Sequence, residues 1–504
     1  MRGASSVALA SALLPSWSSV RARSQFDPSF ASARDALAAL RSGAISSREL
    51  VAHSLERIRK YNPKLNAFVT LLADEASAQA ARADAQRAQK GTLGALHGLP
   101  VLVKDAFATA GVRTTGGSKS LESHVPSEDA VVVARLKQAG AIILGKTNLP
   151  EWSSDWQSYN AVVGQTNNPW DLSRTAGGST GGGAAALAAG IGFLEVGSDL
   201  GGSIRIPSHF CGVYGHKPTL DLVPNRGHIP PGPLRVPLGP LSVAGPLARS
   251  AEDLLLQLSV LGGPSAEDAV AYRWSVPKPR RARLRDYKIG YVLDDPFCPV
   301  DAQVREVLQT AVDTLRSAGV KLVQGWPEGV APSAAYETYS FLLGTTQAPN
   351  LPAARREEVL GWRRAGVSHP WVRGVSSLSY EAFEQNQIRL RFRAVWQRYF
   401  KQHDVFLLPV NFVAAPHHDH SADMLARQLT TSHGARSYMD QPKWVSLATL
   451  AGCPATAAPV GRTKSGLPVG IQIVGPYLED ATCIDVASKL AEVGLRFVPP
   501  PGFA

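Results

Sequence analysis

The sequence predicts an α/β fold, and two observations lead to this prediction. In the first half of the chain, short apolar runs such as residues 101–103 and 141–144 alternate with helix-like segments such as residues 130–139. Strand-like runs at residues 405–410 and 469–474 continue the pattern near the C-terminus. With 44% hydrophobic and 18% charged residues among 504, the chain has enough apolar material for a large core, which excludes a disordered or collagen-like protein.

Two helices are expected from their caps and periodicity. Ser46 and Glu49 have the spacing of a capping box, and the apolar positions of residues 50–58 follow on one face before Asn62-Pro63 is expected to stop the helix. Residues 301–318 carry a second apolar stripe at helical spacing. Both are predicted to be ordinary packing helices.

The charge of the chain is positive but scattered. Lys and Arg number 52 against 41 Asp and Glu, a net charge of +11. The one tight basic cluster, residues 278–285, lies between Pro277 and the strand-like residues 289–293, where a surface linker is expected. We therefore expect no nucleic-acid partner. No apolar stretch approaches the roughly 18 residues of a membrane helix, so no membrane partner is expected either.

The cysteines and the N-terminus bear on the compartment. The four cysteines lie far apart without a C-x-x-C pair, which indicates free thiols and neither a zinc site nor a disulfide framework. Residues 1–25 contain Arg2 and the small, apolar residues 7–14, which resemble half of an export leader, but a twin arginine and a clean cleavage site are missing. We expect a leader or a disordered tail here. The predicted location is cytoplasmic, or periplasmic if these residues are a signal segment.

Two short patterns match well-known sites but lack the required context. Residues 140–147 satisfy the P-loop expression, yet the apolar residues 141–144 are expected to form a strand where the loop should be, with residues 145–147 as its exit. Residues 177–181 match the G-x-S-x-G nucleophile elbow, which needs a strand just before it, and residues 174–176 are not expected to form one. We reject both interpretations.

The histidines are weak candidates. Residues 417–420 are His-His-Asp-His, but consecutive residues cannot all face one ion in regular structure, and the flanking Pro416 and Ser421 indicate a loop. We expect no metal there. His209 and His216 flank the glycine-rich region without an acid at a telling spacing, so packing or hydrogen bonding is the expected role of both.

The most informative stretch is the glycine-rich segment of residues 176–219. Gly201 and Gly202 stand directly before Ser203, and glycines free the backbone to turn its N–H groups toward one point, as in an oxyanion hole. Such a hole needs a nucleophile beside it, and Ser203 is the obvious one. Ser179 lies 24 residues earlier, at the head of a helix of small residues, where a serine is ordinarily an N-cap.

Lys104 is the candidate base. It ends a wholly apolar strand, and a lysine delivered into the interior has its charged form disfavoured, although most lysines at strand ends are exposed. Asp105 follows directly and would favour the ammonium if it faced the same way. Because successive strand residues face opposite sides, we expect Asp105 to lie away from the amine.

Together these residues resemble the amidase signature family. The matching motifs are G-G-S-x-G-G at residues 177–182, G-S-D-x-G-G-S-I-R-I-P at residues 197–207 and F-C-G-V-x-G-x-K-P-T at residues 210–219. The resemblance covers roughly residues 30–495 and matches residues 260–440 poorly. It implies a single amidase domain of residues 26–504 with a variable substrate-region insert at about 260–440.

The resemblance also implies a mechanism and a site. These are a Ser203 nucleophile, a Ser179 proton bridge held in a cis peptide, a Lys104 base and an acyl-enzyme. The implied oxyanion hole consists of the N–H groups of Leu200, Gly201, Gly202 and Ser203. The implied fold is one large mixed β-sheet covered by helices on both faces, with no cofactor and no metal.

Departures from the family pattern bear on the substrate. Thr180 stands where a second serine is usual and Ala176 where proline is frequent, from which we expect tuning of activity. After residue 219 the chain lacks the Y-G-R-V-S-R and S-S-L-D-Q-I-G-P stretches of the tRNA-dependent amidotransferase subunit. We therefore expect a hydrolase of a small-molecule amide, acting alone or as a homodimer. The alternative is an amidotransferase A-type subunit that acts on glutamine in a multi-subunit complex.

Aromatic residues of the poorly matched middle suggest an apolar or aryl acyl pocket, with core packing as the equal alternative. They are Tyr336, Tyr339, Phe341, Trp362 and Trp371.

Overall fold

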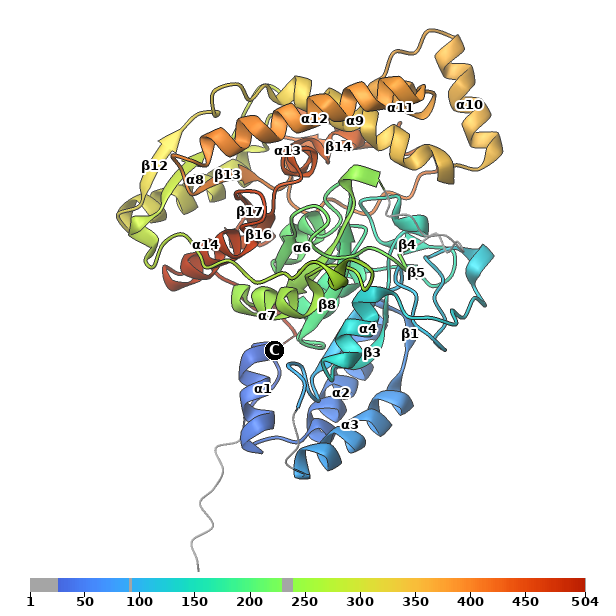
Figure 1. Ribbon diagram of the computed structural model, residues 1–504, viewed down its shortest axis with the longest axis vertical. Coiled ribbons are helices and arrows are strands. Elements are labelled where there is room, and N and C mark those ends of the chain that lie inside the picture. Colours follow the sequence, from blue (N-terminus) through green and yellow to red (C-terminus); the bar gives the residue numbers. More distant parts are fainter. Residues whose placement is uncertain (1–25, 90–92, 229–238, 504) are drawn as a thin grey trace, which may run out of the picture.

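A central sheet of eleven strands organises the molecule (Figure 1). The computed structural model describes residues 26–89, 93–228 and 239–503. In spatial order the strands are β1 (Phe68–Leu71), β3 (Ile142–Thr147), β2 (Pro100–Lys104), β8 (Leu194–Asp199), β10 (Val243–Ala248), β9 (Tyr214–Lys217), β16 (Ala455–Arg462), β17 (Pro468–Val474), β13 (Val405–Pro409), β11 (Lys288–Tyr291) and β12 (Lys321–Gln324).

The sheet is mixed. β2 lies parallel to both β3 and β8, and β11 lies parallel to both β12 and β13. The strands between these two groups pair antiparallel. This architecture confirms the predicted α/β fold with one large mixed sheet.

Helices cover both faces of the sheet, as the alternation along β2 shows. Val101 and Val103 pack in one core with residues of α1, α4 and α7, whereas Leu102 packs in another with residues of α2, α3 and α5. Successive strand side chains point to opposite faces, so a strand that is apolar throughout needs a core on each side. The wholly buried β2 is therefore a central strand.

The helices predicted from the sequence are present, and one of their boundaries differs. They are α1 (Ala33–Ser42), α2 (Ser47–Leu65), α3 (Ala73–Ala88), α4 (Val131–Gln138), α5 (Gly181–Ala188), α6 (Arg205–Cys211), α7 (Ala251–Leu261), α8 (Ala302–Ser317), α9 (Pro332–Gln347), α10 (Ala353–Arg364), α11 (Pro370–Val375), α12 (Ser379–Tyr399), α13 (Lys443–Ala451) and α14 (Asp480–Glu492). The capping box of Ser46 and Glu49 is present. The stop at Asn62-Pro63 is wrong, because α2 continues to Leu65, whose side chain is fully buried in the core.

Two strand predictions are also corrected. β3 continues through residues 145–147, which were expected to be its exit, because this end pairs with both β1 and β2. β7 (Asp171–Thr175) precedes the G-x-S-x-G match, where no strand was expected. β7 pairs with the short β6 (Asn167–Asn168) in a two-stranded sheet outside the central one.

The poorly matched middle is built into the same sheet. Residues 260–440 supply β11, β12 and β13 as well as α8 to α12, and Figure 1 shows α9 to α12 gathered at one end of the molecule. Trp362 and Trp371 pack there against a small separate core of Val359, Val372 and Val375. These two tryptophans are therefore packing residues, whereas α9 brings Tyr339 to the glycine-rich loop described below.

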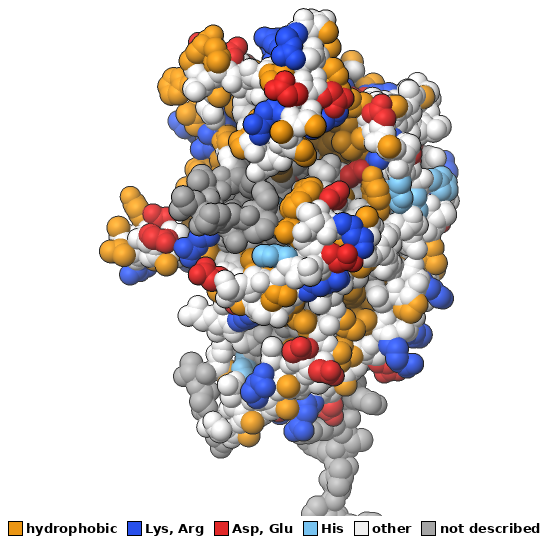
Figure 2. Space-filling model, turned by 90° about the vertical axis from the view of Figure 1, so that its right-hand side faces the viewer, with side chains coloured by type: hydrophobic (Ala, Val, Ile, Leu, Met, Phe, Trp, Pro, Cys, Tyr) orange, Lys and Arg blue, Asp and Glu red, His pale blue; other side chains and the backbone are white. Residues whose placement is uncertain are grey.

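The surface and the termini complete the description. Basic and acidic side chains are interspersed on the face seen in Figure 2, as expected for scattered charge. All four cysteines are buried free thiols. Within the described ranges, no helix has the length and hydropathy needed to cross a bilayer. The predicted leader or tail of residues 1–25 and the residues 229–238 lie outside the described residues.

Candidate active site

Lys104 and Ser179 form a hydrogen bond in the buried interior of the protein. Lys104 ends β2 and is fully buried, and its Nζ lies 2.6 Å from the Ser179 Oγ and 2.9 Å from the Ser198 Oγ. Ser179 is fully buried too. The two residues are 75 positions apart in the sequence, and they meet because β2 and the turn before α5 both lie beside β8.

Burial sets the protonation of Lys104. Loss of solvation lowers the pKa of its ammonium to about 7, against the opposing charges of Glu195 and Asp199. Burial raises the pKa of Glu195 to about 8. Near neutral pH this carboxyl is therefore mostly protonated and stabilises the ammonium form of Lys104 only weakly. Asp105 lies away from this amine, as predicted, and accepts hydrogen bonds from the N–H and hydroxyl of Thr115. At pH 7 a substantial share of the Lys104 amine, about half, is therefore neutral.

Ser179 is not a helix cap. The cap of α5 is Thr180, whose side chain makes no capping hydrogen bond, and Ser179 precedes it with its hydroxyl on Lys104. The Gly178–Ser179 peptide bond is cis, in agreement with the resemblance. A Cβ at Gly197 would lie 2.7 Å from the Thr180 methyl carbon and 2.8 Å from its hydroxyl oxygen, so the packing of Thr180 requires glycine at residue 197.

Ser203 follows two glycines in the loop between β8 and α6. The Thr180 N–H donates to the Ser203 carbonyl at 3.1 Å, which brings the two serine segments together. Ser203 remains 8% exposed, whereas Lys104 and Ser179 are at 0%. Of these three groups, only Ser203 can meet a substrate without rearrangement.

Side chains from two distant parts of the chain hold the loop before Ser203. The Tyr339 hydroxyl donates to the Leu200 carbonyl at 3.2 Å, and the Trp156 indole donates to the Gly201 carbonyl at 2.9 Å. The carbonyl and N–H of one peptide unit point in opposite directions. The Tyr339 contact therefore orients the Gly201 N–H as well.

The N–H of Gly202 differs from the implied arrangement. It donates to the Asp199 carboxylate at 2.9 Å, and that carboxylate is also paired with Arg205 at 2.8 Å. The N–H groups of Leu200, Gly201 and Ser203 donate to no acceptor among the described residues. Gly202 has a φ of +97°, and a Cβ there would approach Ile206 to within 2.7 Å, so this turn requires glycine.

The histidines singled out in the sequence are structural. His209 accepts from the Gly470 N–H at 2.8 Å and lies 3.0 Å from the Val413 carbonyl, and burial lowers its pKa to about 4. His216 lies between Thr456 and Asp480.

The His-His-Asp-His loop holds no donor set. The His420 ring stacks on Tyr159 at 3.9 Å and meets His418 edge-on. Across the described part of the chain, no three His, Cys, Asp or Glu side chains are placed to hold a metal ion.

One residue escaped the sequence analysis. His228 lies with its Nε2 2.8 Å from the Ser198 Oγ, and Ser198 is itself a partner of Lys104. A single histidine in a Gly-Pro-rich stretch carries no periodicity and no motif, so no local signal identifies it. Only the position of Ser198 within the G-S-D motif pointed to this region.

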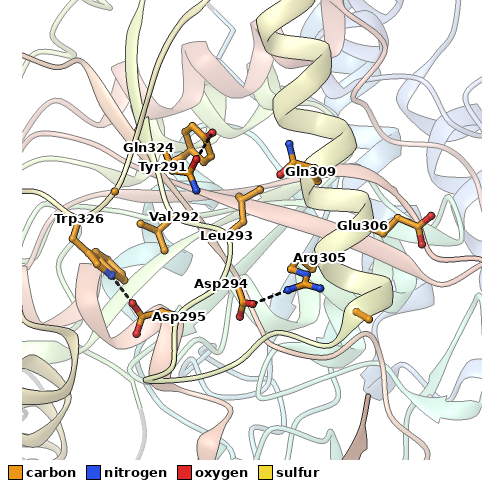
Figure 3. A pocket seen from close by; sticks show the side chains of 12 residues that line it. Tyr291, Val292, Leu293, Asp294, Asp295, Arg305, Glu306, Gln309, Gln324 and Trp326 are labelled. Atoms are coloured by element: carbon orange, nitrogen blue, oxygen red, sulfur yellow. Dashed lines mark hydrogen bonds and ion pairs between the residues drawn. The ribbon is translucent and has the colours of Figure 1, made fainter. Parts of the chain in front are cut away.

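A separate cavity of about 680 Å³ lies at the other end of the sheet (Figure 3). It is lined by the ends of β11 and β12 and by one side of α8. Arg305 pairs with Asp294 at 3.0 Å, and the Trp326 indole donates to Asp295 at 2.8 Å. None of the predicted site residues lines it.

Comparison with known proteins agrees with this geometry. A family model described as Amidase matches residues 49–484. The A subunit of glutamyl-tRNA(Gln) amidotransferase from Synechococcus sp. (strain CC9605) is 34% identical over 497 residues, covering 92% of this chain and 96% of its own. The corresponding protein of Thermotoga maritima superposes with a TM-score of 0.74 at 25% identity, over 94% of this chain and 98% of that one. A bacterial aryl acylamidase of the amidase signature family, 24% identical, shares the fold with a TM-score of 0.77 over 93% and 97%.

These matches define a class of α/β enzymes that act on amide bonds. The chain belongs to the amidase signature family, and it is an enzyme that hydrolyses carbon–nitrogen bonds of amides.

Proposed function

We propose that the protein cleaves a carboxylic acid amide by acyl transfer to Ser203, with Ser179 as proton bridge and Lys104 as base. The observation that carries the proposal is the 2.6 Å contact between Lys104 Nζ and Ser179 Oγ, in an interior that lowers the pKa of the amine to about 7 and so makes its neutral form available. A neutral amine beside a hydroxyl can accept its proton, which a charged ammonium cannot do.

The steps balance as acyl transfer. The Ser203 oxygen forms a bond to the amide carbon, its proton passes to Ser179, and the Ser179 proton passes to Lys104. Lys104 then returns the proton through Ser179 to the leaving nitrogen as the carbon–nitrogen bond breaks. Water adds to the acyl-enzyme by the same route, releasing the acid and restoring Ser203.

We propose a smaller oxyanion hole than the family resemblance implied. The N–H groups of Leu200, Gly201 and Ser203 support this proposal because no described residue accepts from them. The Gly202 N–H is already used by Asp199. Each correctly placed donor contributes about 3 to 4 kcal/mol to the stabilisation of the transition state.

Two substrate classes compete. The amidotransferase subunits among the similar proteins favour glutamine as the amide, with ammonia passed on inside a complex. The absence of the amidotransferase stretches after residue 219 favours a small-molecule amide. The comparisons weigh more heavily for the first, against the free-standing hydrolase that we expected, so glutamine is the first amide to test.

Ammonia release distinguishes the two classes. The purified protein is offered glutamine and a matched set of aliphatic, aryl and amino-acid amides, with Ser203→Ala as the control. Turnover of glutamine alone, together with copurified partner chains, supports the amidotransferase function. Turnover of aryl or aliphatic amides by the isolated protein supports the hydrolase, and equal activity of Ser203→Ala would exclude both.

A serine-directed fluorophosphonate tests the assignment of roles. We expect the adduct on Ser203, which is partly exposed beside the free N–H groups, and none on the buried Ser179. Mass spectrometry that finds the adduct on Ser179 would reverse the two roles. A homodimer and the cellular compartment stay predictions.

A further inference from the structure

A chain of four hydrogen-bonding groups runs through the base. Lys104 Nζ contacts the hydroxyl of Ser179 on one side and that of Ser198 on the other, at 2.6 and 2.9 Å. The Ser198 Oγ in turn lies 2.8 Å from His228 Nε2. Ser198, on β8, is buried, and His228 is 9% exposed. The proposed mechanism uses Ser179 and Lys104 and leaves the other two groups without a role.

Counting donors and acceptors shows why the second side matters. A neutral lysine amine has two N–H donors and a single lone pair. To take the proton of Ser179, the amine must direct that lone pair at the Ser179 hydroxyl. Its contact with Ser198 must then use an N–H, so the Ser198 oxygen must accept and the Ser198 proton must go elsewhere. His228 Nε2 is an acceptor within reach of that proton when the ring carries its proton on Nδ1.

We propose that His228 is a positioning residue that holds the Ser198 proton away from Lys104 and thereby directs the lysine lone pair at Ser179. Without this acceptor, the Ser198 hydroxyl is free to donate to the amine, which occupies the lone pair and leaves Ser179 without a base. The inference rests on the proposed function and adds to it the group that orients the base.

The fold holds His228 in place independently of Ser198. The Ala108 N–H donates to the Gly227 carbonyl at 2.9 Å, which fixes this loop on the segment that follows β2. The imidazole lies edge-on to the Phe107 ring, with 5.1 Å between centroids. Gly227 has a φ of +93°, and a Cβ there would lie 2.4 Å from the Ala130 Cα, so the close approach of the loop requires glycine. The position of the imidazole ring therefore does not depend on its contact with Ser198.

A matched pair of substitutions tests the acceptor. In His228→Gln the amide oxygen can occupy the place of Nε2, whereas the shorter side chain of His228→Asn would end about one bond short of it. For that reason we expect His228→Gln to keep kcat within roughly threefold and His228→Asn to lower kcat roughly 10- to 100-fold, with KM changed less than about twofold. Equal kcat for both variants and the unsubstituted protein would overturn the inference.

A double-mutant cycle tests whether His228 acts through Ser198. Ser198→Ala removes the competing hydroxyl, so His228→Asn should have almost no further effect on kcat in that background. A full, multiplicative loss in the double variant would show that His228 acts by another route. All four proteins of the cycle are compared by kcat per folded molecule, with the folded fraction measured by circular dichroism, so a lower stability of His228→Asn does not imitate the loss of this interaction.

Two controls separate the possible failures. His97→Asn alters a half-buried histidine whose Nε2 lies 2.9 Å from the Ala83 carbonyl, away from Lys104, and should leave kcat unchanged. Ser203→Ala tests the proposed function itself. If Ser203→Ala retains turnover, the proposed function is wrong; if it is inactive while His228→Asn is fully active, only the role of His228 is wrong.

Discussion

Two buried lysines on neighbouring strands differ in one respect that decides their chemistry. Lys104 on β2 and Lys146 on β3 are both fully buried, and burial lowers their pKa values to about 7 and about 8. Lys146 is paired with the Asp105 carboxylate at 3.5 Å and donates to the Phe107 carbonyl and the Thr114 hydroxyl. The side-chain partners of Lys104 are two hydroxyls.

The difference shows that burial alone does not make a base. The negative charge of a carboxylate stabilises an ammonium, and a carbonyl can only accept hydrogen bonds. The surroundings of Lys146 therefore favour its charged form. A hydroxyl can donate as well as accept, so the surroundings of Lys104 serve either protonation state. This contrast supports the proposed role of Lys104 in proton transfer, whereas the contacts of Lys146 hold the turn after β2.

Removing the Lys104 amine should give the largest effect. We expect Lys104→Ala to lower kcat/KM by several orders of magnitude, on the order of what loss of one member of a catalytic triad costs. Lys104→Arg should not rescue activity, because a guanidinium does not deprotonate in this range. Steady-state kinetics on the most reactive amide measure both. Near-native turnover of the arginine variant would make Lys104 a structural charge.

The matching change at Lys146 should act on stability. Lys146→Met leaves the buried Asp105 carboxylate without its cation, which costs about 3 to 5 kcal/mol of folding free energy. Urea unfolding followed by circular dichroism gives this quantity, and kcat per folded molecule should stay within about tenfold. A stable variant with no activity would instead place Lys146 in the chemistry and end the distinction between the two lysines.

The pH dependence should report Lys104 alone. In the proposed mechanism the neutral amine is the active form, so kcat/KM should fall about tenfold per unit as pH decreases below about 7 and should level off above it. Lys146, with a pKa of about 8, should add no second limb. A limb that persists unchanged in a Lys104 variant with residual activity would show that another group titrates.

The smallest expected effect concerns the loop before Ser203. Tyr339→Phe removes the hydrogen bond to the Leu200 carbonyl, worth about 1 kcal/mol, and should lower kcat about fivefold with little change in KM. Tyr336→Phe is the matched control, because the Tyr336 hydroxyl contacts the Met439 carbonyl instead. If both variants lose the same activity, the loss comes from packing of α9 and not from the orientation of the Gly201 N–H.

Much of the site could be predicted because its residues lie in continuous motifs. Ser203 stands after Gly201 and Gly202 in a motif that resembles the amidase signature family, and that resemblance also names Lys104 as the candidate base at the end of an apolar strand. The use of the Gly202 N–H could not be predicted in the same way. It depends on which direction one peptide unit turns, and Asp199 decides that through a hydrogen bond.

The sequence by itself determined the fold class and the buried central strands, because periodicity is a local property. Its short motifs named the candidate nucleophile, bridge and base through their resemblance to the amidase signature family. The tertiary structure alone decided which buried lysine has hydroxyl partners, which N–H groups are free, and that His228 lies against Ser198, 30 residues away in the chain. These contacts join different strands and loops, and a distance between elements leaves no trace in local spacing. For that reason the residues of the site could be named from the sequence, but the direction of its hydrogen bonds could not.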